Sequence, residues 1–318
     1  MTSSRVYSRG YRGQQDLQAM IGLIKKRPLD QIADYPGILD LQEMLAVPKI
    51  QSQTRLWMDP DGQLVSFTFL DGDDSSASLV FEIASSCKDR GLVEQIMAWV
   101  GTTIQQTRPA DNGIFLLDTS SRISNPGRIM LLERLGFEPQ TGGAVHLERS
   151  LSEPIAAPQL PPGFLIRPIN GEMEAEDWVR LHRAALGTEN MTTEYKLAMM
   201  RTPFYNPDMD LVTVTPKGVL AAYCVCFING EENAITGLKV GHTDPIATHP
   251  DFQRRGLSKA LILTGLALLK ERGMDIAALS TGEENIAMIH TAESVGFHIK
   301  NKVIRYVKPL HFGQGEKR

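Results

Sequence analysis

The sequence predicts an α/β protein made of two similar domains, each built on a mixed β-sheet. Length is the first reason, because 318 residues suggest about two domains of ~100–200 residues each. The second reason is a stretch at 151–163 with four prolines and few large apolar residues, a composition typical of a linker. We therefore expect one domain at residues 1–150, a linker at 151–163 and a second domain at 164–318.

The third reason is an internal repeat, because four landmarks follow one another in the same order in the two halves. They recur at offsets of 156, 165, 160 and 160 residues. The matching segments are Asp59–Gly62 with Thr215–Gly218, Lys88–Leu92 with Gln253–Leu257, Asn125 with Asn285, and Gly136-Phe137 with Gly296-Phe297. A single match is weak, but four in order at near-constant spacing indicate that the halves share one fold.

Each half reads as a helix, a hairpin, a strand, a basic turn, a helix, a strand, a helix and a closing strand. The hairpins are predicted by Pro and Gly at the second and fourth turn positions, followed by apolar alternation. Thr192 or Thr193 is a suitable helix N-cap, and Gly296 is a suitable left-handed helix stop. In the second half we expect helices at Met173–Leu186, Thr193–Arg201 and Glu284–Val295, with strands at Ile276–Ser280 and Val303–Val307. Strands joined by apolar helical crossovers predict an α/β arrangement with a mixed sheet.

The composition is that of a soluble globular protein, with 42% hydrophobic and 22% charged residues. A formal net charge of -4 predicts no broad attraction to nucleic acid or to an anionic membrane. No apolar run is long enough to span a bilayer, and the N-terminal residues lack the apolar core of a signal peptide. The three cysteines fit neither a disulfide framework nor a zinc pattern, so we expect a cytoplasmic protein with reduced thiols and no metal.

The segment Pro250–Lys259 lies between a strand-like run and a long apolar helix-like run. A glycine and small residues at such a turn leave backbone N–H groups free to point at an anion, and the helix N-terminus adds its positive dipole end. Arg254 and Arg255 add positive charge. The turn is expected to cradle a phosphate or pyrophosphate. Two simpler explanations remain: a tight turn alone would require Gly256, and the arginines would suit any solvent-exposed helix start.

The pattern Gln-x-x-Gly-x-small after a strand, followed by Asn285 and then Gly296-Phe297, resembles that of the GCN5-related N-acetyltransferase (GNAT) superfamily. The resemblance covers residues 167–307 well and residues 9–147 more weakly. Two such domains in one chain are similar to the tandem arrangement of mycothiol synthase and its relatives. The resemblance implies an α/β (α+β) fold of two tandem domains, each a mixed, mostly antiparallel twisted sheet flanked by helices, with acetyl-CoA as the acyl donor.

The resemblance also implies which residues hold the cofactor. The turn would hold the coenzyme A pyrophosphate, and the strand before it would pair its backbone with the pantetheine arm, which is strand addition by a ligand. Asn285 would contact the cofactor arm, unless it is only a residue of the first helical turn. Ser258 stands where the family usually has Gly or Ala, and its hydroxyl could donate to a phosphate. The residues carried over are Ile246, Ala247, Thr248, Gln253, Arg254, Arg255, Gly256, Leu257, Ser258, Lys259 and Asn285.

The corresponding turn of the first half, Lys88–Val93, departs from the family pattern. Val93 is β-branched where a small residue is needed, and Asp89 would bring negative charge towards a phosphate. We therefore expect the first domain to have lost cofactor binding and to serve packing, dimerisation or substrate enclosure.

The groups that would transfer protons are less well defined. The family often places a Glu on the strand that leads to the turn, and here the corresponding residues are His242 and Asp244. Strand alternation predicts that both share a face with Ile246 and Thr248, and His242 has an intrinsic pKa suited to accepting a proton near neutrality. His242 is equally explained as a polar residue at a strand end, and Asp244 as part of a turn or bulge.

Ala292 occupies the position at which many members of the family carry the Tyr that protonates the leaving thiolate. Water could serve instead, because a CoA thiolate is a tolerable leaving group. Ser280-Thr281-Gly282 ends a predicted strand, and either shapes the acceptor site or forms a plain turn.

These features predict direct acetyl transfer from acetyl-CoA to a primary amine of a small molecule, in the C-terminal domain of a monomer or homodimer. An N-acetyltransferase acting on a protein N-terminus or lysine is an alternative of the same class. A non-catalytic acyl-CoA-binding or regulatory protein is an alternative of another class, favoured by Ala292 and by the missing Glu.

Overall fold

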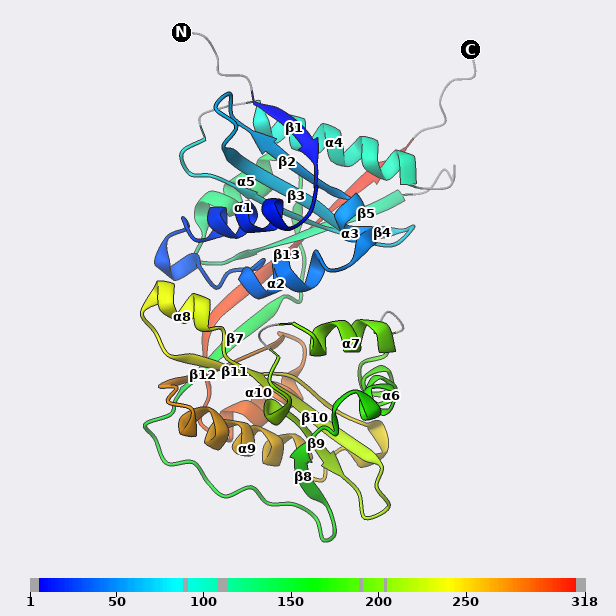
Figure 1. Cartoon of the computed structure of the whole chain (residues 1–318), viewed down its shortest axis with the longest axis vertical. Coiled ribbons are helices and arrows are strands. Elements are labelled where there is room, and N and C mark those ends of the chain that lie inside the picture. Colours follow the sequence, from blue (N-terminus) through cyan, green and yellow to red (C-terminus); the bar gives the residue numbers. More distant parts are fainter. Residues whose placement is uncertain (1–5, 88–90, 108–113, 189–190, 203–204, 313–318) are drawn as a thin grey trace. The chain divides into compact units, whose positions relative to one another are not determined.

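The computed structural model describes residues 6–87, 91–107, 114–188, 191–202 and 205–312. The chain divides into two compact units, whose elements are labelled in Figure 1. The first unit is Met1–Thr141 with Ile304–Arg318, and the second is Gly142–Val303.

The first unit is a mixed sheet with helices. Its elements are β1 (Tyr7–Gly10), α1 (Gln14–Ile24), η1 (Leu29–Gln31), α2 (Ile38–Met44), α3 (Pro48–Ser52), β2 (Thr54–Met58), β3 (Leu64–Gly72), β4 (Ser76–Ile83), α4 (Leu92–Thr107), β5 (Ile114–Arg122), α5 (Pro126–Arg134), β6 (Glu138–Pro139) and the C-terminal part of β13 (His298–His311). The strand order is β1-β2-β3-β4-β5-β13, with β6 beside β13. Strands β1 to β4 pair antiparallel, whereas β4 and β5 are parallel.

The second unit repeats this plan. Its elements are β7 (Ala144–Ser150), β8 (Leu165–Pro168), η2 (Gly171–Glu174), α6 (Ala175–Leu186), α7 (Thr193–Met200), η3 (Pro207–Met209), β9 (Asp210–Val214), β10 (Leu220–Phe227), α8 (Gly230–Thr236), β11 (Val240–Thr248), η4 (Pro250–Phe252), α9 (Leu257–Glu271), β12 (Ile276–Gly282), α10 (Ile286–Glu293) and the N-terminal part of β13. The strand order is β8-β9-β10-β11-β12-β7-β13. Only β11 and β12 pair in parallel among these described strands.

The sheet of the second unit is covered on both faces around β10 and β11. Alternate residues of a strand point to opposite faces. Cys224 of β10 packs in a core with α9, whereas the adjacent Tyr223 packs in a second core with Trp178 of α6. β11 contributes Ala247 to the second core. The strand that the sequence predicts to bind the cofactor arm, β11, is therefore packed against core residues on both faces of the sheet.

Each half of the sequence contributes a strand segment to the unit built mainly from the other half, and this corrects the predicted domain boundaries. β7, predicted to close the first domain, pairs with β12 and β13 of the second unit. Residues from Ile304 onward belong instead to the first unit, where Tyr306 is buried. The physical reason is burial, because Val145 and Leu147 fill the core of the second unit. The predicted linker also differs, since Leu151 at its start is buried in that same core.

The turns of the two units correspond closely to the repeat seen in the sequence. Asn125 and Asn285 are both helix N-caps, and each side chain accepts a hydrogen bond from the backbone N–H three residues later. Gly136 and Gly296 both adopt positive φ, 78° and 93°, just after the helix that each asparagine begins. Both halves therefore use the same local signals to start and stop this helix.

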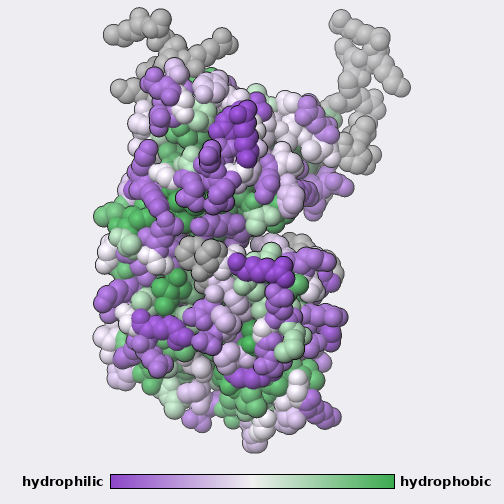
Figure 2. All heavy atoms as spheres, viewed as in Figure 1, coloured by the Kyte–Doolittle hydropathy of each residue, from purple (hydrophilic) through white to green (hydrophobic). Residues whose placement is uncertain are grey.

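The visible surface in Figure 2 has hydrophilic side chains interspersed among hydrophobic ones over both units. Within the described ranges, no helix is long and apolar enough to cross a membrane. The same residues contain no group of three or more His, Cys, Asp or Glu side chains that could hold a metal ion.

A buried ion pair ties α7 to the start of β9. Lys196 and Asp210 are both 0% exposed, and Nζ and Oδ2 lie 2.5 Å apart. Nζ also lies 3.9 Å from the centre of the Trp178 ring. The Tyr205 hydroxyl donates to the same Asp210 oxygen at 2.9 Å. Burial, and then the charge of Asp210, raises the pKa of Tyr205, so this hydroxyl keeps the proton that it donates.

Candidate active site

Strands β11 and β12 run side by side and then separate. The ladder between them ends at the pair His242 and Ala278. Two residues further on, Asp244 Oδ2 accepts a hydrogen bond from the backbone N–H of Ser280 at 3.1 Å. The carboxylate takes the place of the next ladder bond, and beyond it the two strands diverge.

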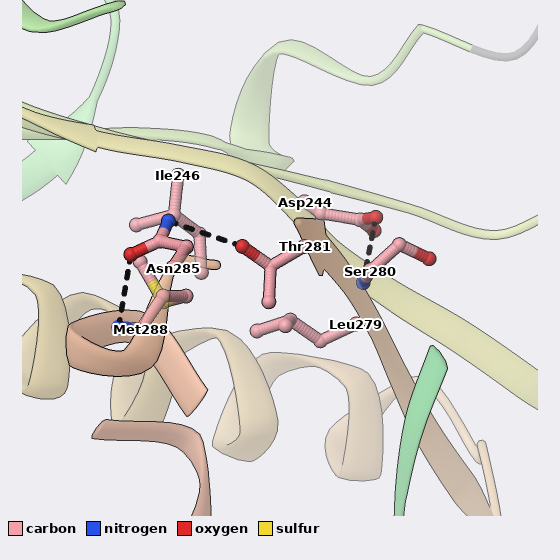
Figure 3. A pocket seen from close by; sticks show the side chains of 7 residues that line it. All are labelled: Asp244, Ile246, Leu279, Ser280, Thr281, Asn285 and Met288. Atoms are coloured by element: carbon pink, nitrogen blue, oxygen red, sulfur yellow. Dashed lines mark hydrogen bonds between the residues drawn. The ribbon is translucent and has the colours of Figure 1, made fainter. Parts of the chain in front are cut away.

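The divergence opens a pocket between β11, β12 and the start of α10. Its lining residues are Asp244, Ile246, Leu279, Ser280, Thr281, Asn285 and Met288. Figure 3 shows Asp244 and Ser280 at one end of the pocket, and Asn285 and Met288 at the other. The hydrogen bond from Ser280 to Asp244 therefore closes the pocket at the end where the strands meet.

The stretch Ile246, Ala247 and Thr248 has the backbone edge that strand addition by a ligand requires. On one side all three residues pair with β10 in antiparallel register. On the other side the ladder to β12 has already ended. An open strand edge presents N–H and C=O groups that can bind an extended chain of amides.

A bulge in β11 lies between the predicted catalytic and cofactor-binding residues. Cys224 pairs with Ile246, whereas Cys226 pairs with Thr243. β11 therefore has one residue more than β10 over this interval, and the alternation of its side chains shifts by one position.

This bulge corrects the prediction that the two sets of residues share a face. Thr243 lies against α9, so its neighbours His242 and Asp244 point to the opposite face. Ile246 returns to the α9 side, where it packs against the core, and the Thr248 hydroxyl bonds to a residue of α9. A bulge leaves no trace in the hydropathy pattern, which explains why strand alternation failed here.

The basic turn begins α9 without a side-chain cap. Gly256 is the N-cap residue, its φ is 79°, and none of the described side chains caps this helix start. A Cβ built on Gly256 would meet nothing within 4 Å, so glycine is needed for its left-handed backbone and not for lack of room. Arg254 also has a positive φ, 61°. When left-handed and right-handed backbone conformations alternate along the chain, successive N–H groups point to the same side and form a concave anion-binding site, called a nest.

Positive charge surrounds this turn on its solvent side. Arg254, Arg255 and Lys259 are all exposed. Arg255 donates to a backbone carbonyl of η4, and its guanidinium lies 5.6 Å from the centre of the Phe252 ring. Leu257 is buried in the core instead, so its side chain anchors the turn and only its backbone can reach a ligand.

The turn is tied to the end of β11 by two hydrogen bonds. Ser258 Oγ and Thr248 Oγ1 lie 2.8 Å apart, and Gln253 Nε2 donates to the Thr248 carbonyl at 3.4 Å. A hydroxyl has a single proton, so donation from Ser258 to a phosphate requires Thr248 to act as the donor between them.

Asn285 joins α10 to β12. Its Oδ1 accepts a hydrogen bond from the Met288 N–H at 3.2 Å, and its Nδ2 donates to Thr281 Oγ1 at 3.1 Å. Both bonds are drawn in Figure 3. The structural interpretation of Asn285 as a helix-start residue therefore holds, and contact with a cofactor arm stays a prediction that its place in the pocket lining allows.

His242 is stacked on Phe227 of β10. The ring centres lie 4.4 Å apart with planes 2° from parallel, and Nδ1 is 4.0 Å from Asp244 Oδ1. Burial, and then the charge of His146, lowers the pKa of His242 to about 4. The ring is therefore uncharged at neutral pH and accepts a proton less readily than its intrinsic value suggests.

Ser280 and His146 form a polar pair that no sequence pattern indicated. They are opposite each other in the antiparallel register of β12 and β7, and Ser280 Oγ lies 2.9 Å from His146 Nδ1. His146 belongs to the first half of the sequence. It reaches this site only because β7 joins the second unit.

Acid should destabilise the folded protein through His242. Its folded pKa of about 4 lies below the unfolded value of ~6.5, so the unfolded chain binds a proton first as the pH falls. The free energy of unfolding should therefore decrease as the pH falls from ~6.5 towards ~4, by about 2 kcal/mol at about pH 4.5. The His242→Phe substitution keeps an aromatic ring on Phe227 and should remove this loss.

Urea unfolding at about pH 7 and about pH 4.5 measures this difference. The control is His290→Phe, because His290 lies exposed on α10. An equal loss of unfolding free energy in the wild type and in His242→Phe would show that burial of His242 has no such effect.

The turn of the first half that corresponds to the anion cradle, Lys88–Arg90, lies outside the described residues. The helix that follows it is α4, which begins at Leu92. The expected loss of cofactor binding in the first domain therefore stays a prediction.

Residues 175–297 match the family model of the acetyltransferase (GNAT) family. The chain is similar to a mycothiol acetyltransferase of Cellulomonas flavigena, with 30% identity over 150 residues that cover 45% of this chain and 43% of that protein. It is 27% identical to a mycothiol acetyltransferase of Thermobispora bispora over 155 residues, which cover 48% of this chain and 52% of that protein. These two matches span about half the length of the curated relatives.

Two solved structures resemble the whole chain. A GCN5-related N-acetyltransferase from Sphaerobacter thermophilus has a TM-score of 0.70 at 19% identity and covers 98% of each chain. A tandem GNAT protein from the clavulanic acid biosynthesis pathway has a TM-score of 0.70 at 16% identity, over 98% of this chain and 99% of that chain. At these identities the likeness concerns the fold, and it confirms the predicted mixed, mostly antiparallel sheet flanked by helices.

Proposed function

Because residues 175–297 match the acetyltransferase (GNAT) family model and the chain shares its fold with a tandem GNAT protein, we propose that its second unit transfers the acetyl group of acetyl-CoA to a primary amine of a small molecule. The observation that carries the proposal is the open edge of β11. This edge runs from the basic start of α9, which has no side-chain cap among the described residues, to the end of the pocket closed by Asp244 and Ser280. A donor with a pyrophosphate, an arm of amides and a reactive end matches these features in order.

The donor would bind along β11 from its phosphates to its thioester. The pyrophosphate would accept hydrogen bonds from the first-turn N–H groups of α9, beside the exposed Arg254 and Lys259. The amides of the arm would pair with the open edge at Ile246, Ala247 and Thr248. The thioester would then lie at the closed end of the pocket.

Transfer would be direct. The amine nitrogen attacks the carbonyl carbon, the C–S bond breaks, its electron pair stays on the CoA sulfur, and the amine loses a proton. A backbone N–H of β11 at the closed end of the pocket would polarise the carbonyl. Asp244 and His242 would line the acceptor side, where the carboxylate and the uncharged ring can each accept a hydrogen bond from the neutral amine.

Acetyl-CoA binding without catalysis is the second candidate, and one observation favours it. Ala292, at the position of the family's usual acid, is 0% exposed and lies in the core with α9. A methyl group there protonates nothing, so the leaving thiolate must take its proton from another source.

Amine-dependent release of free CoA is the expected result when the protein is mixed with acetyl-CoA and primary amines. A suitable panel is glucosamine, alaninamide, phenethylamine and a lysine-containing peptide, with a thiol reagent to detect CoA. Release with a small amine, saturating in acetyl-CoA, would support the proposal. Tight binding of acetyl-CoA without release would favour the second candidate, and release with the peptide alone would indicate a protein acceptor.

We also propose that the first unit binds no acetyl-CoA. Since β7 of the first half lies in the second unit and the chain from Ile304 lies in the first, the test uses the whole chain instead of an isolated half. Calorimetric titration should give about one acetyl-CoA per chain, and a stoichiometry of about two would overturn this part of the proposal.

A further inference from the structure

The closed end of the pocket carries a serine–histidine pair. Ser280 lines the pocket, and its backbone N–H is bound by Asp244 at 3.1 Å. Its Oγ lies 2.9 Å from His146 Nδ1. Since both the backbone and the side chain of Ser280 have partners, the position of its hydroxyl oxygen is well defined.

This pair lies on the face of the sheet that an acceptor would approach. Leu279 and Leu147, which adjoin Ser280 and His146 in sequence, are buried in the core with α9. Because side chains alternate along a strand, Ser280 and His146 point to the opposite face, as Asp244 does. Figure 3 shows the Ser280 hydroxyl directed away from the α10 end of the pocket.

The attacking amine needs a proton acceptor on this face, and His242 is poorly suited to the task. Burial, and then repulsion from His146 whenever that ring is protonated, lowers the pKa of His242 to about 4, so the His242 ring holds few protons at neutral pH. Asp244 already accepts the Ser280 N–H. A histidine within hydrogen-bond reach of a hydroxyl is the arrangement by which enzymes draw a proton through that hydroxyl.

Building on the proposed acetyl transfer, we propose that Ser280 and His146 carry the proton away from the attacking amine. As the amine nitrogen bonds to the carbonyl carbon, its N–H proton passes to Ser280 Oγ and the Ser280 hydroxyl proton passes to His146 Nδ1. The C–S bond breaks, its electron pair stays on the CoA sulfur, and the thiolate takes a proton from water. His146 then releases its proton to solvent, so both residues return to their starting state.

The two residues have different parts in this step. Ser280 is the catalytic residue, because its oxygen touches the amine. His146 is a positioning residue that acts through Ser280, and it must begin the step with its ring proton on Nε2 so that Nδ1 accepts the hydrogen bond from Ser280.

Substitutions at both positions separate proton transfer from simple positioning. Ser280→Ala removes the hydroxyl and Ser280→Thr keeps it. His146→Asn keeps a hydrogen-bond acceptor in place of Nδ1 but takes up no proton, and His146→Ala leaves room for added imidazole. The assay is CoA release with whichever amine of the panel reacts fastest.

We expect kcat to fall by about 100-fold or more in Ser280→Ala and in His146→Asn, the usual scale of general base catalysis. The KM for acetyl-CoA should stay within about threefold of the wild-type value, because the donor contacts are intact. Ser280→Thr should retain most of kcat, and imidazole should restore part of the kcat lost in His146→Ala. His290→Asn, on the exposed side of α10, is the control.

The outcomes distinguish this inference from the proposed function. Wild-type kcat in Ser280→Ala or in His146→Asn would overturn the relay and leave acetyl transfer standing. If the wild type itself releases no CoA with any amine, the proposed function is overturned and the relay with it. If a His146 variant fails to fold, judged by its melting temperature and acetyl-CoA affinity, the comparison of Ser280→Ala with Ser280→Thr decides.

Discussion

Gly256→Asp is expected to weaken acetyl-CoA binding by about 100-fold or more. Gly256 is the N-cap of α9, with φ 79° and open space where a Cβ would stand. An aspartate carboxylate at this position would face the pyrophosphate at the first-turn N–H groups. Close like charges cost several kcal/mol, and about 1.4 kcal/mol corresponds to tenfold in affinity.

The matched control is Gly256→Asn, because Asn has the shape of Asp, tolerates a positive φ and carries no charge. Calorimetric titration with acetyl-CoA should show the large loss for Asp only, while the three proteins melt at similar temperatures. Unchanged affinity in Gly256→Asp would remove the start of α9 as the donor site.

Lys196→Met is expected to destabilise the second unit by about 3–5 kcal/mol. Lys196 and Asp210 are both 0% exposed, so the substitution leaves the Asp210 carboxylate buried without its counter-ion. It also removes the ammonium group that lies 3.9 Å from the centre of the Trp178 ring. Adding Asp210→Asn should recover part of the loss, because the amide still accepts from Tyr205 and carries no charge.

The exposed pair of Arg201 and Glu172, 3.1 Å apart and 66% and 56% exposed, is the control. Arg201→Met should cost less than about 1 kcal/mol, because solvent screens such pairs. Urea unfolding can be followed by tryptophan fluorescence, to which Trp178 is the single contributor from residues 142–303. A cost for Lys196→Met no larger than that for Arg201→Met would contradict the expectation.

The local backbone structure around the candidate cofactor-binding residues could be predicted well, because it depends on short stretches of chain. Gly256 has the left-handed backbone that its place at a strand-to-helix turn suggests, and α9 begins at the next residue. The predicted stretch Ile246–Thr248 is the last part of β11, with one edge open. Thr192, one of the two residues expected to cap this helix, is the N-cap of α7.

The placement of the candidate catalytic residues could be predicted only in part. His242 and Asp244 do lie beside each other near the pocket, but the bulge turns them away from the face of Ile246. Burial changes the pKa of His242, which the intrinsic value for histidine does not anticipate. The sequence places Ser280 at a strand end that either shapes the acceptor site or forms a plain turn, and no local pattern marks His146.

The sequence by itself determined the tandem repeat, the GNAT fold and the basic turn at Gly256. Its signals are turn residues, helix caps and hydropathy periods, and each of these acts over a few neighbouring residues. The tertiary structure decided which unit contains β7 and which contains the end of β13, which face carries His242, and that Ser280 meets His146. These outcomes depend on contacts between residues more than a hundred positions apart, or on a one-residue bulge, and hydropathy records neither.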